Sequence, residues 1–73
     1  MSGSLKLYSG AEVVKKLQSN GWKVVRQKGS HVMMTKVGYI YTLSIPQHKE
    51  LGVGILKKIL QQAQTNSDEF NKL

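Results

Sequence analysis

Cysteine is absent from this 73-residue chain, and acidic residues are scarce, with four Asp and Glu against eleven Lys and Arg. Without cysteine, neither a disulfide framework nor a thiolate metal site can form. No apolar run approaches the roughly 20 residues of a membrane-spanning helix, and no charged-then-apolar signal peptide opens the chain. We therefore expect a cytoplasmic protein that acts without a membrane.

The length of the chain is suited to one domain. A chain near this size buries only about 60 % of its unfolded surface, which excludes an enclosed substrate cavity between two lobes. Met1–Ser4 is typical of an expression-tag remnant, and residues 5–73 are expected to form the single domain. Any chemistry should then take place on an open face or in a shallow groove.

The charge is strongly one-sided, with a net value of +7 and an isoelectric point near 9.9. Such an excess creates a positive field that attracts polyanions and binds them through their phosphates. An acidic protein and an anionic membrane are the alternative partners. The charge favours a nucleic acid.

Hydrophobic spacing predicts two amphipathic helices. Ser9 and Glu12 have the spacing of a capping box at the start of the first helix. Gly21 can adopt the left-handed backbone conformation that commonly ends a helix. The lysines on the outward sides of the two helices, which include Lys57 and Lys58, are interpreted as ordinary solvated surface. The predicted helices span about 10–20 and 53–64, with a short helical turn within 66–73.

Three strands are expected between these helices, over 22–28, 31–36 and 39–45. Gly29-Ser30 is suited to a two-residue hairpin turn, and Val37-Gly38 can turn the chain again. Pro46 should end the third strand because it has no amide hydrogen for the ladder. The predicted fold is therefore α+β with the order α-β-β-β-α, an antiparallel sheet with both helices on one face.

Two-residue turns at both hairpins would fix the faces of the sheet. They pair Lys28 with His31, and Lys36 with Tyr39, and side chains then alternate between the faces. The expected core face carries Val25, Val32, Met34, Tyr41, Leu43 and Ile45. The expected open face carries Arg26, Lys28, His31, Met33, Thr35, Thr42 and Ser44, with Trp22, Val24 and Ile40 at one end. It places His31 beside Lys28 and across from Ser44.

The candidate chemistry is concentrated on the two histidines. No His, Asp or Glu has metal-ligand spacing, and no phosphate loop or nucleophile elbow is present. A free imidazole titrates near neutral pH, so His31 on a basic face can deprotonate the 2′-hydroxyl of RNA while Arg26 and Lys28 hold the phosphate. The alternative is that His31 is merely solvated.

His48 can act as general acid, touch RNA or bond to local backbone. Trp22, Tyr39 and Tyr41 can stack bases, although Tyr41 is assigned to the core and Trp22 to a packing anchor.

Two motifs carry a family resemblance: R-Q-K-G-S-H at Arg26–His31 and P-Q-H-K-E-L at Pro46–Leu51. With the helix start at 54–60, they resemble the HicA toxins, which are small messenger-RNA interferases of prokaryotic toxin–antitoxin pairs. The resemblance implies a fold like the double-stranded-RNA-binding domain and a HicB-like antitoxin that masks the RNA site. It also implies that His31 is the catalytic residue.

The sequence departs from the family pattern at three places. Val32 replaces a frequent second histidine, Ile55 a common threonine, and Gln64-Thr65 the usual Gly-Leu before the last turn. None of these changes removes His31.

The predicted function is a metal-independent endoribonuclease without a cofactor, whose catalytic residue is His31. Its predicted RNA contacts are Arg26, Lys28, Gly29, Ser30 and Ser44, and the general acid is His48 or Lys28. Two other classes stay open: an RNA-binding module that does not cut, and an interaction protein whose charge serves only an acidic partner.

Overall fold

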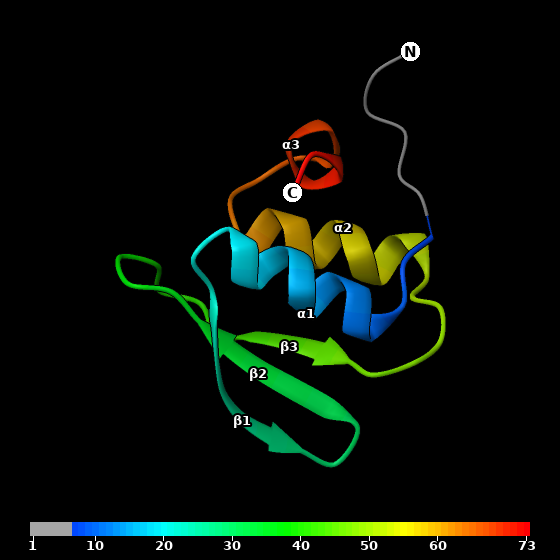
Figure 1. Cartoon of the computed structure of the whole chain (residues 1–73), viewed down its shortest axis with the longest axis horizontal. Helices are drawn as coiled ribbons and strands as arrows, with labels where there is room; N and C mark the ends of the chain where they lie inside the picture. The colour runs from blue at the N-terminus through cyan, green and yellow to red at the C-terminus, as the bar shows by residue number, and fades with distance from the viewer. Residues whose placement is uncertain (1–6) are drawn as a thin grey trace.

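The computed structural model describes residues 7–73 and has the predicted α-β-β-β-α order, followed by a short third helix. The three antiparallel strands are ordered β1-β2-β3. Helices α1 and α2 lie on the same side of this sheet, and α3 lies above them, away from the strands (Figure 1). The expected tag remnant, Met1–Ser4, is outside the described residues. The elements are α1 Gly10–Ser19, β1 Lys23–Lys28, β2 His31–Thr35, β3 Leu43–Pro46, α2 Val53–Gln62 and α3 Ser67–Asn71.

Local signals at both ends of α1 are confirmed. The Ser9 side chain accepts from the Glu12 amide at 3.1 Å, and the Glu12 carboxylate accepts from the Ser9 amide at 2.9 Å. At the other end, Gly21 has a φ of 94°. The Gly21 amide donates to Gln18 and the Trp22 amide to Leu17, which together form a Schellman motif.

The capping box makes a prediction about acid stability. Hydrogen bonds from the Ser9 backbone and side chain, with the nearby Lys16 charge, lower the pKa of Glu12. A lowered folded-state pKa stabilises the fold above the ordinary carboxyl pKa, and this contribution is lost as pH falls through the folded-state value. Glu12→Gln keeps a capping-box side chain and should therefore weaken the acid-side dependence of the urea midpoint on pH. An unchanged pH dependence would contradict the assignment.

The first hairpin has the predicted turn. Lys28 lies opposite His31, and Arg26 lies opposite Met33. Gly29 has a φ of 60°, as the first central position of a type II′ turn requires. The start of β2 is therefore fixed in register against the basic end of β1.

A bulge in β1 makes part of the predicted face assignment wrong. Val24 pairs with Met34, and Arg26 pairs with Met33, so Val25 is an extra residue. Because of this extra residue, the side chains that precede it in β1 point to the opposite face of the sheet from the one that simple alternation predicts. Val24 therefore shares the helix side with Met34, and Trp22 is buried, as a packing anchor should be, rather than lying on the open face. Val25, expected in the core, is 55 % exposed.

The second hairpin is also longer than predicted. Met34 lies opposite Leu43 and Val32 opposite Ile45, so the pairing is shifted by two residues and the connection takes up 36–42. A shift of two keeps each strand's faces, and Val32, Met34, Leu43 and Ile45 are all buried as expected. The first half of the predicted third strand is not strand. Tyr41, expected in the core, is 47 % exposed, and Ile40 lies in the exposed connection.

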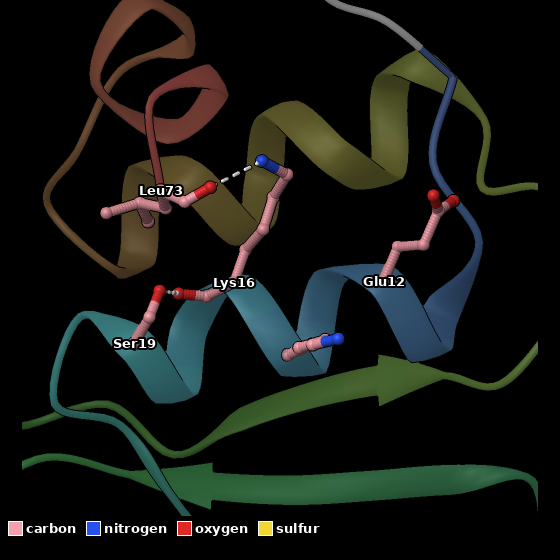
Figure 2. Close-up of a pocket in the computed structure, with 5 residues that line it drawn as sticks. Glu12, Lys16, Ser19 and Leu73 are labelled. Carbon is pink, nitrogen blue, oxygen red and sulfur yellow. Dashed lines mark hydrogen bonds between the residues drawn. The ribbon is translucent and has the colours of Figure 1, made fainter.

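The core lies between the sheet and the helices. Its largest fully buried side chains are Trp22, Phe70, Leu17, Met34, Leu43, Ile45, Leu51, Leu56 and Val13. Phe70 brings α3 into this core and meets Tyr8 edge to face at 5.2 Å. Lys16 donates to the Leu73 carbonyl at 2.9 Å (Figure 2), which ties the end of the chain to α1.

The end of α2 contains a strained residue at the position where the family resemblance expects glycine. Gln64 has a φ of 57°. Its amide donates to Gln61, and the Thr65 amide donates to Leu60, which again forms a Schellman motif. A side chain other than glycine is disfavoured in this left-handed conformation.

Gln64→Gly should therefore raise the free energy of unfolding by about 0.5–1 kcal/mol, because relief of strain exceeds the added entropy of the unfolded chain. The melting temperature should rise by a few degrees. Gln61→Gly, within α2, is the matched control and should lower stability by up to about 1 kcal/mol. If both changes destabilise equally, the strain assigned to Gln64 is wrong.

Candidate functional site

The predicted basic site lies on the face of the sheet away from the helices, called here the outer face. Lys28 and His31 are cross-strand partners, and Arg26 and Ser44 both lie opposite Met33. These four site residues are exposed. Ser44 is thus diagonal to His31 rather than directly across from it, since Pro46 takes the opposite position. The two-residue shift in register explains this correction and leaves all four on the predicted face.

The carbonyl groups of the Gly29-Ser30 turn accept one backbone and one side-chain hydrogen bond. The Ser30 carbonyl accepts from the Gln47 amide at 2.6 Å, and the Gly29 carbonyl accepts from the Gln27 side chain at 3.3 Å. Gly29 and Ser30 are both exposed. The turn is therefore fixed to the segment after β3, while both residues remain open to solvent beside His31.

A groove on the α2 side of His31 was not predicted. It has a volume of about 300 Å³, runs between the outer face of β3 and α2, and is called the α2 groove. It is lined by His31, Thr42, Ser44, Pro46, Ile55, Lys58, Ile59 and Gln62.

Lys58 is the charged residue of this groove that the sequence interpretation missed. The helical spacing predicts a solvated helix face for Lys58 and its neighbour Lys57. Ile55, Lys58 and Gln62 are spaced so that they lie on one side of a helix, but this spacing does not show which strand that side faces. The packing of α2 beside β3 brings Lys58 to the groove that contains His31.

His48 lies apart from this arrangement. Its side chain is exposed and is not among those that line the α2 groove. Its backbone carbonyl accepts from the Gly10 amide at 2.9 Å. The visible role of His48 is thus a backbone contact that joins α1 to the segment after β3.

Two of the three aromatic candidates pack against each other. The rings of Trp22 and Tyr39 are 5.3 Å apart, and the Lys36 ammonium lies 4.8 Å from the Tyr39 ring centre. Trp22 is buried and therefore cannot stack a base, whereas Tyr41 is accessible.

In a separate hollow on α1, lined by Glu12, Lys15, Lys16, Ser19 and Leu73, three of the polar side chains already form hydrogen bonds (Figure 2). Lys16 donates to Leu73, Ser19 donates to the Lys16 carbonyl, and Glu12 accepts from Ser9. This hollow therefore belongs to the packing of the C-terminus. Within residues 7–73, no three His, Asp or Glu side chains are grouped to hold a metal ion. No helix in that range is long and apolar enough to cross a membrane.

Comparison with known families decides the membership of the chain. The family described as the HicA toxin of bacterial toxin–antitoxin pairs matches residues 10–65, which is most of the chain. The chain belongs to the HicA toxin family. No curated protein matches it.

Membership of the HicA family gives the chain the role of a toxin and implies an antitoxin as its partner. The matched residues include both strands of the first hairpin, β3 and the whole of α2. His31, its cross-strand neighbours and the α2 groove are thus all within the part of the chain that carries the family pattern.

Proposed function

We propose that this HicA-family toxin is a metal-independent endoribonuclease that cuts messenger RNA, with His31 as general base. The observation that carries the proposal is the position of His31 on an open face, with Lys28 directly opposite on β1 and the Lys58 groove on the other side. A base between two cations matches a reaction that removes one proton and accumulates charge on phosphorus.

The reaction uses the nucleophile that RNA already carries. His31 takes the proton of a 2′-hydroxyl, whose oxygen attacks the adjacent phosphorus. The bond from phosphorus to the 5′ oxygen breaks, which leaves a 2′,3′-cyclic phosphate and, after protonation, a 5′-hydroxyl. Arg26 and Lys28 stabilise the charge on the phosphorane, while Gly29, Ser30 and Ser44 contact the RNA.

Lys28 and His48 are the two candidates that can supply the proton for the leaving 5′ oxygen, and we assign this role to Lys28. The cross-strand position of Lys28 favours the lysine, because a general acid must come within hydrogen-bond reach of the reacting atoms. His48 projects from a segment that does not line the groove.

The antitoxin partner is a HicB-like protein that covers the outer face around His31. One basic face serves both RNA and antitoxin, so the two compete. Messenger RNA is a cytoplasmic substrate, and the toxin acts in that compartment by stopping translation.

The test is incubation of the purified protein in EDTA with a long RNA and, separately, with DNA of the same sequence. Cleavage of the RNA alone is expected, because DNA lacks the 2′-hydroxyl. If the protein binds the RNA but leaves it intact, the ribonuclease proposal is wrong and the protein is an RNA-binding module. Absence of RNA binding at low salt would leave only an interaction with an acidic protein.

A further inference from the structure

The α2 groove has the composition of a nucleotide subsite. We infer that it binds one unpaired nucleotide of single-stranded RNA next to the phosphodiester bond that is cut. This inference rests on the proposed ribonuclease function and adds the class of substrate: the toxin acts on single-stranded segments of RNA.

The floor of the groove is apolar. Pro46 and Ile59 are buried, and Ile55 contributes an aliphatic side chain that stays 45 % exposed. Ile55 therefore offers apolar surface to an incoming group, since the core does not cover it. The flat face of a nucleobase can pack on this surface and remove it from water.

The other side chains that line the groove are polar, and only His31 and Lys58 among them are ionisable. The Thr42 and Ser44 hydroxyls and the Gln62 carboxamide can both donate and accept hydrogen bonds. Unpaired bases present donors and acceptors on their Watson–Crick edges. These three side chains can therefore contact a base edge while the apolar floor receives its face.

Lys58 supplies the phosphate contact at this subsite. In the sheet order β1-β2-β3, His31 is on the central strand, with Lys28 on one side and the Lys58 groove on the other. A lysine ammonium is a compact charge that suits phosphate oxygens. A strand of RNA that crosses His31 thus meets a cation before and after the bond to be cut.

The size of the groove limits what can enter. Sites for small molecules commonly have volumes of roughly 300–1,000 Å³, so a groove of about 300 Å³ accepts one nucleotide rather than a stacked run. Bases in an A-form duplex are paired and stacked, and their major-groove edges are inaccessible to side chains. A duplex cannot place a base here without unpairing it.

Neighbouring residues of α2 provide matched controls for a cleavage assay in EDTA. Lys58→Gln and Lys57→Gln remove the same charge from exposed positions, but only Lys58 lines the groove. Lys58→Gln should reduce kcat/KM on single-stranded RNA by roughly tenfold more than Lys57→Gln, because it removes a charged hydrogen bond as well as field. Gln62→Ala should likewise exceed Gln61→Ala. Equal effects within both pairs would overturn the subsite.

A binding experiment separates this inference from the ribonuclease proposal. The probe is a short RNA with 2′-O-methyl groups, which cannot be cut, added to the wild-type protein while amide NMR signals are followed. Shifts at Thr42, Ser44 and Gln62 with the single strand, much weaker with its duplex, would support the subsite even if the protein cuts nothing. Shifts confined to β1, equal shifts with the duplex, or no shifts would overturn it whether or not RNA is cleaved.

Discussion

His31→Ala is expected to lower RNA cleavage by about 100-fold or more, the usual contribution of a positioned general base. His31 is exposed at the first position of β2 and packs into no part of the core. The substitution should therefore change the free energy of unfolding by no more than about 0.5 kcal/mol. RNA affinity should be nearly unchanged, because Arg26, Lys28 and Lys58 supply the phosphate contacts.

His48→Ala is the matched control for this prediction. His48 is the other histidine of the chain and is also exposed, and the backbone carbonyl that accepts from Gly10 survives the substitution. It should cut RNA at close to the wild-type rate. Rates that are equal for His31→Ala and the wild type would contradict the role of His31, and a large loss in His48→Ala would make His48 the general acid.

The second large effect is expected at Gly10, the first residue of α1. A Cβ atom there would overlap the Pro46 carbonyl oxygen and lie 2.8 Å from Cα of Gln47. Both neighbours are backbone atoms that cannot rotate away, and Gly10 also donates to the His48 carbonyl. Gly10→Ala should cost about 3 kcal/mol or more and lower the melting temperature by on the order of 15 °C.

Gly54→Ala provides the comparison, because outside the neighbouring backbone of α2 no heavy atom lies within 4 Å of a Cβ at this position. It should leave stability unchanged or raise it by up to about 1 kcal/mol. Equal stability of Gly10→Ala and the wild type in thermal unfolding would show that α1 does not begin against the segment after β3. The contact matters for the site because Pro46 is the cross-strand partner of His31.

Local sequence signals predicted those parts of the fold that depend on near neighbours. The Ser9–Glu12 capping box and the Gly29-Ser30 turn each involve atoms a few residues apart, and both form as expected. The first hairpin therefore placed His31 beside Lys28 correctly. Because the second hairpin shifted by an even number of residues, Ser44 also stayed on the expected face.

The errors came from features that only tertiary packing determines. The alternation of side chains along a strand does not show where a bulge occurs. Because Val25 is an extra residue, Trp22 lies on the buried face of the sheet and not on the open face that simple alternation predicts. Val37-Gly38 is a competent turn by composition, but pairing of Leu43 with Met34 leaves a longer connection. The position of Lys58 at the groove was missed for a similar reason, because the periodicity of a helix does not show which strand the helix packs beside.

The central claim is that His31 deprotonates the 2′-hydroxyl of RNA without a metal ion, and analysis of the product ends tests it most directly. RNA is incubated with the wild-type protein in EDTA, and the termini of the fragments are identified by mass spectrometry. The account predicts 2′,3′-cyclic phosphates and 5′-hydroxyls, absent with His31→Ala. Fragments that end in a 3′-hydroxyl and a 5′-phosphate would contradict it, because attack by water rather than by the 2′-hydroxyl leaves those ends.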